Sequence, residues 1–262
     1  MGEFGLENQR IQAFLSSEPF VRSCGVLETY QQLLIDNKDN SAKCGDIKRR
    51  LYEVFDQKNG GGKIKDKSRK KLSHEFGQIR EQVYDLCESG KFTKEKMAEL
   101  YAKSSISDKL LEQWNPKAGT INPNGHFIVN EAMEYVNDGP ENKDVDINIL
   151  PTSVKGTGEL LSKVLEGLQK VAKEMKNGSL MHADQVVMTS WLFGASFENK
   201  FKVIFGENIV LEDVSGEIVN EIQTLALSYN RRVMAEYLTT GQLPPVRRLI
   251  MPKDDFISRF SV

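Results

Sequence analysis

The chain has 262 residues, of which 39% are hydrophobic and 27% are charged, and its formal net charge is −2. This length suits one large domain or two small lobes, and a net charge near zero argues neither for nor against nucleic acid as a partner. No apolar run reaches the roughly 20 residues of a membrane span, and the first residues lack the basic and apolar regions of a signal peptide. We therefore expect a cytoplasmic protein without a membrane span.

Helical spacing of apolar residues dominates the first part of the chain. It predicts one or two helices over 8–36 and single helices over 42–57 and 66–89, followed by short helices over 93–103 and 105–114. The clearest is 66–89, where Leu72, Phe76, Ile79, Val83 and Leu86 follow one another in steps of four and three. Because this seam is too short for a sustained coiled coil, we interpret it as a helix that faces a core.

The second part of the chain mixes helical patterns with short ambiguous segments. We predict a loop over 115–125, a helix over 127–137, a short strand over 145–150 and long helices over 153–176 and 216–239. The apolar stretch 186–193 belongs to a core. Segments 201–205 and 209–211 are either a β-hairpin or two helix ends, and these alternatives stay open. An apolar tail starts at Pro244 and is expected to dock on its own core or on a neighbour.

These elements predict a mostly α fold, a two-lobed helical domain with at most one small β-hairpin. The expected N-terminal helical lobe spans 1–114, and a linker of loops and one short helix spans 115–151. The expected C-terminal helical lobe, with its extended tail, spans 152–262.

Known catalytic and binding motifs fail when their chemistry is tested. The segment 56–67 has the length of a calcium loop, but Lys58 and Lys67 stand where carboxylates are needed. A phosphate loop at 62–63, a dinucleotide loop at 156–158, a nucleophile elbow at 194–198 and a nuclease half-motif at 198–200 each lack required residues or context. The three cysteines, Cys24, Cys44 and Cys87, have no zinc spacing. We assign no catalytic residue, metal or cofactor.

Charge is distributed unevenly despite the neutral average. Seven basic residues and one acidic residue between Lys58 and Lys71 give a local charge of +6, whereas the segment 131–146 has a local charge of −5. Free backbone N–H groups and lysines beside a glycine-rich loop favour phosphate. The candidate polyanion-binding residues are Lys63, Lys65, Lys67, Arg69, Lys70, Lys71, Arg231, Arg232, Arg247 and Arg248. The alternative is that both charged runs are only solvated.

The leading functional hypothesis is a non-enzymatic helical interaction or scaffold protein that binds a protein partner or itself. Its expected surfaces are the basic loop, the acidic segment and the apolar tail. The first alternative is a nucleocapsid-like protein that binds single-stranded RNA through the basic loop. The second is an enzyme without a recognisable motif.

Overall fold

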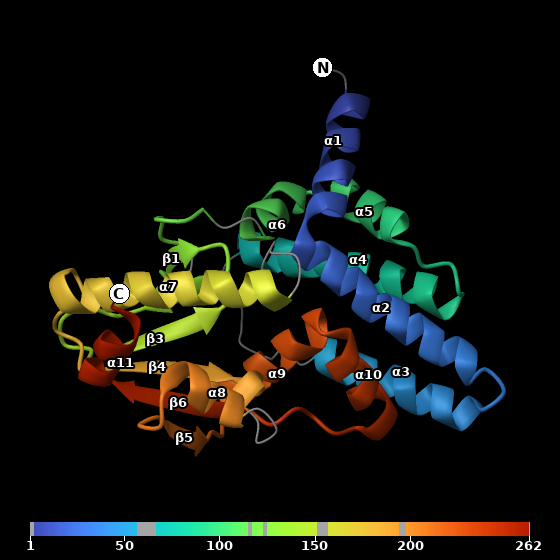
Figure 1. The fold of residues 1–262 in the computed structure, drawn as a ribbon. Helices are drawn as coiled ribbons and strands as arrows, with labels where there is room; N and C mark the ends of the chain where they lie inside the picture. Colours follow the sequence, from blue (N-terminus) through green and yellow to red (C-terminus); the bar gives the residue numbers. More distant parts are fainter. Residues whose placement is uncertain are drawn as a thin grey trace. The chain divides into compact units, whose positions relative to one another are not determined.

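The computed structural model describes residues 3–56, 67–114, 117–122, 125–150, 157–193 and 198–261. The chain forms two compact units (Figure 1). Unit 1 comprises Met1–Trp114 and Thr224–Leu243, and unit 2 comprises Asn115–Gln223 and Pro244–Val262. The division into lobes made from the sequence stays a prediction, and the two units are described separately below.

The predicted fold class is wrong. Helices make up 61% of the structure, but 14% is strand, arranged in one six-stranded mixed sheet. An all-α protein with at most one small hairpin is therefore excluded. The strands escaped prediction because each has only four to six residues. Over so short a stretch, strand and helix patterns of apolar residues cannot be separated.

Unit 1 is helical. Its elements are α1 (Glu3–Ser16), α2 (Glu18–Asp36), α3 (Ser41–Asp56), α4 (Lys67–Glu88), α5 (Lys94–Lys103), α6 (Ser107–Trp114), the end of α9 (Glu217–Tyr229) and α10 (Arg231–Thr240). The core contains the fully buried rings of Phe14, Phe20 and Tyr30 together with Cys24 and Leu51. Helix α2 contacts α1, α3, α4, α5 and α10, so it is the helix around which this unit packs.

The helix predicted over 216–239 is two helices. Asn230 separates α9 from α10, and its side chain accepts hydrogen bonds from the backbone N–H groups of Arg232 and Val233. Such a cap satisfies donors that an unbroken helix would bond internally. Asn230 therefore marks the end of α9 and caps the start of α10, although the helical spacing of apolar residues continues across it.

Unit 2 is built on the sheet, whose strands are β1 (Phe127–Asn130), β2 (Met133–Val136), β3 (Asp144–Ile149), β4 (Gln185–Ser190), β5 (Val210–Asp213) and β6 (Arg247–Pro252). Their order is β1-β2-β3-β4-β6-β5. Strands β3 and β4 are parallel and the other pairs are antiparallel. Helix α7 (Thr157–Asn177) lies in the connection between the two parallel strands, which need such a crossover.

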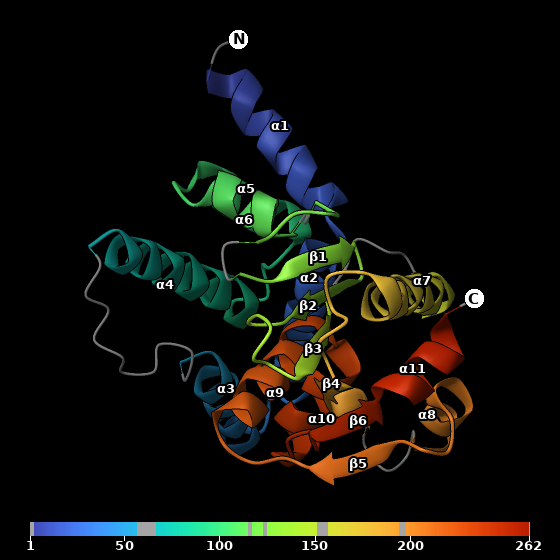
Figure 2. The same cartoon turned by 90° about the vertical axis from the view of Figure 1, so that its left-hand side faces the viewer.

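Helices cover one face of this sheet. Helix α7 contacts β1 and β2, while α11 (Lys253–Phe260) contacts α7, β4 and β6 (Figure 2). The buried core between them includes Met133, Ile147, Met188, Leu249 and Phe256. Alternate residues point to the opposite face, where Glu134 is paired in register with Asn148, and Arg248 with Thr189. That second face therefore combines these polar side chains with the apolar Ile128, Val187 and Ile250.

Several local predictions in unit 2 need correction. The helix predicted over 127–137 is the antiparallel pair β1–β2, in which Phe127 and Tyr135 lie opposite each other. The strand predicted over 145–150 is confirmed as β3. Neither alternative for 201–211 holds, because α8 (Glu198–Phe205) is followed by β5. The apolar tail forms β6 and α11, and Leu249, Phe256 and Phe260 are buried within unit 2.

Candidate functional site

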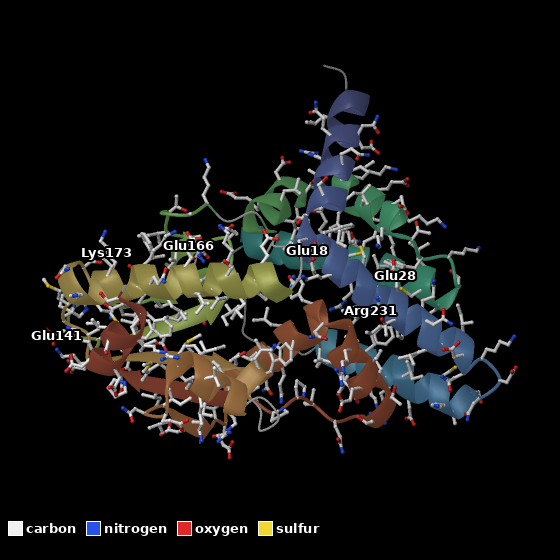
Figure 3. The ribbon with its side chains drawn as sticks, viewed as in Figure 1. Glu18, Glu28, Glu141, Glu166, Lys173 and Arg231 are labelled. Atoms are coloured by element: carbon white, nitrogen blue, oxygen red, sulfur yellow. The ribbon has the colours of Figure 1, made fainter. Side chains whose placement is uncertain are left out.

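The ten predicted polyanion-binding residues are divided between the two units, with eight in unit 1 and two in unit 2. Lys63 and Lys65 lie outside the described residues. Lys67, Arg69, Lys70 and Lys71 begin α4, but their side chains are also outside the description. Arg231 and Arg232 are exposed in the first turn of α10 in unit 1. Arg231 is labelled in Figure 3. The proposed basic-loop site therefore stays a prediction.

The two remaining arginines of that set lie on opposite faces of β6 because side chains alternate along a strand. Arg247 forms an ion pair with Asp213, at 3.2 Å from its Nε, and donates from Nη2 to the carbonyl oxygen of Leu211 at 3.3 Å. Arg248 lies between Thr189 on β4 and Glu212 on β5. These neighbouring arginines cannot bind one ligand on one face.

The acidic segment 131–146 is used inside unit 2. Glu131 forms an ion pair with Lys163 at 3.0 Å, and Asp144 accepts from the side-chain amide of Gln185 at 2.9 Å. A backbone hydrogen bond and Lys163 lower the pKa of Glu131. Partial burial and the nearby Asp144 carboxylate raise the pKa of Asp146. Glu131 and Asp144 are thus bonded within unit 2, whereas Asp138, Glu141 and Asp146 are exposed.

A groove with a volume of about 590 Å³ lies in unit 2 between α7 and the β1–β2 pair. It is lined by residues from the segment before β1, from β1 and β2, and from α7 and its C-terminal loop: Ala118, Gly119, Phe127, Val129, Tyr135, Lys170, Val171, Lys173, Glu174 and Ser179. The rings of Phe127 and Tyr135 lie side by side, with centroids 5.2 Å apart and planes inclined by 32°. The groove therefore offers an aromatic wall to a ligand.

Charged and polar side chains surround these rings. Lys170 forms an ion pair with Glu166 at 2.8 Å. Among the residues that the structure describes, the Lys173 ammonium group has no ion pair or hydrogen bond, and Figure 3 shows this side chain projecting from α7. Glu174 accepts from the backbone N–H and hydroxyl of Ser179, both at 3.0 Å. Lys173 is thus a cation available to a ligand at the groove.

Tyr135 connects the aromatic wall with this polar rim. Burial raises the pKa of its phenol, a hydrogen bond with Ser179 lowers that pKa, and the Glu174 carboxylate raises it again. The net direction is upward, so the hydroxyl keeps its proton at neutral pH and is able to donate a hydrogen bond. One end of the groove therefore contains a protonated phenol, a hydroxyl and a carboxylate.

A second polar cluster lies on the face of the sheet away from α7. Its centre is the carboxylate of Glu134, which is 6% exposed. His126 approaches it with Nδ1 at 2.6 Å from Oε1. Asn122 donates to Oε2 at 2.9 Å, and Asn148 donates to Oε1 at 3.3 Å. A buried carboxylate with three partners holds the imidazole in one orientation.

Sequence reasoning missed both features. His126 stands alone in the sequence, and its partner Glu134 is counted there only as one charge of the acidic segment. The available signals for two strands were the short apolar run from Phe127 to Val129 and the placement of Glu134 between Met133 and Tyr135. With those strands paired, a register argument would have placed Phe127 beside Tyr135 and His126 near Glu134.

The rejected motifs fall largely on residues that the structure does not describe. Positions 57–66, 151–156 and 194–197 lie outside the description, as do the side chains of 198–200. Within the described part of the chain, no group of three histidine, cysteine or carboxylate side chains is arranged to hold a metal ion. Burial raises the pKa of Cys24 and of Cys87 to about 12, so neither thiol is a nucleophile at neutral pH.

Comparisons with family models, curated proteins and solved structures find no match for this chain. None of the helices in the described ranges is both long enough and apolar enough to cross a bilayer. A functional assignment therefore has to be argued from the groove and the cluster themselves.

Proposed function

We propose that this protein binds a small ligand that carries a planar ring next to a phosphate or carboxylate group, and that the groove of unit 2 is the binding site. The observation that carries the proposal is the combination of the Phe127–Tyr135 ring pair and the available Lys173 ammonium group in one groove. Aromatic side chains stack on flat rings, and an ammonium group attracts an anion.

The size of the groove favours a small molecule over a nucleic-acid strand. Its volume of about 590 Å³ lies within the roughly 300–1,000 Å³ of typical ligand pockets. A single-stranded nucleic acid uses a long basic groove with several stacking platforms. One ring pair bordered by two lysines and one glutamate supplies a single stacking position.

Two of the three surfaces expected for a scaffold are used at least in part within unit 2. The apolar tail forms β6 and α11 in its own unit, and Glu131, Glu134 and Asp144 of the acidic segment have partners within unit 2. The basic loop, the third surface, lies largely outside the described residues. Ligand binding in unit 2 accordingly ranks above self-assembly as a proposal, with RNA binding kept as an outcome of the test.

Isothermal titration calorimetry on the full chain tests this proposal. The probes are adenosine monophosphate, indole-3-acetate and a short single-stranded oligoadenylate. The informative variants are Lys173→Glu, which reverses the ligand-facing charge, and Phe127→Leu, which removes the ring but keeps an apolar side chain. Lys176→Glu is the matched control, since Lys176 is exposed on the same helix and does not line the groove.

We expect binding of at least one small probe, weakened about tenfold or more by Lys173→Glu because a charge-assisted hydrogen bond contributes about 1.5–3 kcal/mol. Phe127→Leu should weaken it several-fold, and Lys176→Glu should leave it unchanged. Binding of the oligonucleotide alone would favour the RNA alternative. Equal effects of Lys173→Glu and Lys176→Glu, or no binding of any probe, would rule out this use of the groove.

A further inference from the structure

One wall of the groove comes from a hairpin that extends the sheet beyond β1. Within it, Gly119 donates to the carbonyl of Ile128 and Ile128 donates to that of Thr120, both at 2.8 Å. Residue Ile121 is bridged to Phe127, and Asn122 donates to the carbonyl of His126 at 2.9 Å. The same hairpin supplies Ala118, Gly119 and Phe127 to the groove.

The Glu134 cluster contacts this hairpin on the face that points away from α7 and the groove. Because side chains alternate along β1, Phe127 faces α7 while the residues on either side of it, His126 and Ile128, face away. His126 and Asn122 both belong to the hairpin, and both bond to the Glu134 carboxylate on β2. Asn148 on β3 bonds to the same carboxylate. Glu134 therefore joins the hairpin to two neighbouring strands.

The turn of the hairpin is also tied to this cluster. The Asn122 side-chain oxygen accepts from the backbone N–H of His126 at 3.0 Å, while its side-chain nitrogen donates to Glu134. Among the described residues, Glu134 is the titratable side chain that bonds to His126. A displacement of the Glu134 carboxylate would therefore shift both strands of the hairpin, and Phe127 would move with them.

We propose that Glu134 is a positioning residue for the groove, acting through His126 and Asn122 to hold Phe127 against Tyr135. This inference rests on the proposed function for its affinity test, but its structural part does not depend on a ligand. Glu134 touches no ligand in this scheme. Its loss should loosen the hairpin 118–128 and weaken ligand binding without altering any side chain that lines the groove.

Measuring the Glu134→Gln variant at two pH values separates a positioning role of Glu134 from a general loss of stability. A neutral imidazole can switch tautomer, accept from the new amide N–H at Nδ1, and leave the amide oxygen for Asn122. Asn148 donates to the same Glu134 oxygen as His126 and loses this acceptor whichever form the imidazole takes. When the imidazole is protonated, Nδ1 carries a hydrogen and faces the amide N–H₂. The carboxylate of the wild type accepts from either form of the imidazole.

The experiment measures the affinity for adenosine monophosphate at about pH 8 and about pH 5.5, together with hydrogen exchange of the hairpin amides. We expect the ratio of wild-type to Glu134→Gln affinity to rise about tenfold on acidification, with faster exchange in 118–128 at the lower pH. The ratio cancels the ionisation of the probe. Adding His126→Phe to Glu134→Gln should remove this pH dependence.

The matched control is Glu131→Gln, which changes a nearby carboxylate whose partner is Lys163. It should show no pH-dependent loss. An affinity ratio for Glu134→Gln that is constant with pH, together with unchanged hairpin exchange, would overturn the positioning role. If the wild type binds no probe, the proposed function fails, and hairpin exchange alone then decides whether Glu134 positions this wall. Asn148→Ala provides a second test should Glu134→Gln not fold.

Discussion

The two units differ in what they bury. Among the described residues, the buried polar side chains of unit 1 are all hydroxyls: Ser17, Ser104, Ser107, Thr224 and Ser228. Those of unit 2 are the amide of Asn130 and the carboxylate of Glu134. A hydroxyl in a helix can bond to a carbonyl one turn earlier, as Ser228 does to Thr224 at 2.7 Å. A buried carboxylate needs several donors from separate segments.

This difference indicates where specific geometry is concentrated. Unit 1 requires helices with matching apolar faces. Among its described residues, Ser104 and Ser228 bond to nearby carbonyl oxygens, whereas the buried hydroxyls of Ser17 and Ser107 have no hydrogen-bond partner. Unit 2 requires Asn122 and His126 of the hairpin and Asn148 of β3 to converge on Glu134 of β2. Buried polar networks that are fully bonded fix a single arrangement of the segments that form them. Unit 2 is therefore the part of the molecule better suited to hold a binding groove in shape.

The largest effect is expected from removing a fully buried ring in each unit. Phe256 on α11 and Phe14 on α1 are both 0% exposed. Replacing either by alanine should lower the free energy of unfolding by about 3–5 kcal/mol because it leaves a cavity. Hydrogen exchange should accelerate first in unit 2 for Phe256→Ala and first in unit 1 for Phe14→Ala. Faster exchange in the same amides for both variants would contradict the division into two cores.

Alkaline pH should weaken unit 1 next. Burial raises the pKa of Cys24 and Cys87 to about 12, so the folded unit keeps both thiols protonated where the unfolded chain loses these protons, above about pH 8.5. The contribution of these thiols to stability is therefore constant below that pH and falls above it, by about 1.4 kcal/mol per pH unit for each thiol.

Denaturant titrations between about pH 7 and about pH 10 would measure this slope. The Cys87→Ala variant should be less stable at neutral pH, because its side chain is buried, but should show about half of the thiol contribution to the slope. A slope that is the same in wild type and variant would mean that the thiols are accessible in the folded protein.

The smallest effect separates two glycines of α7. A Cβ on Gly167 would lie 2.6 Å from the terminal carbon of Met133, whereas a Cβ on Gly158 has nothing within 4 Å. Gly167→Ala should lower the free energy of unfolding by about 1–3 kcal/mol through overpacking against β2. Gly158→Ala should raise it by up to about 1 kcal/mol through better helix propensity. Equal effects in a denaturant titration would show that α7 and β2 are not in close contact.

The sequence located the long helices well and the strands poorly. Residues 66–89 and 153–176 were predicted as helices, and α4 and α7 occupy nearly those ranges. A helix bonds within itself, so its own apolar spacing is enough to indicate it. A strand as short as β1 is stabilised by a partner, and only its pairing with β2 distinguishes it from one turn of helix.

The candidate site shows the same limit. The sequence contains Phe127, Tyr135 and Lys173, but nothing in their spacing shows that they border one groove. It also contains His126 and Glu134, whose contact depends on the antiparallel register of β1 with β2. By contrast, the basic segment 58–71 was visible at once, because local charge needs no partner to be counted.

The amino-acid sequence by itself determined the positions of the long amphipathic helices, the uneven distribution of charge and the three widely spaced cysteines. Only the tertiary structure decided that β6, near the end of the chain, pairs with β4 and that parts of the acidic segment form β2 and β3. It also decided that Glu134 joins the hairpin to the neighbouring strands. The physical reason is the distance along the sequence over which each property acts. Helical periodicity and charge are local properties, whereas strand pairing and buried polar contacts join residues that the sequence keeps apart.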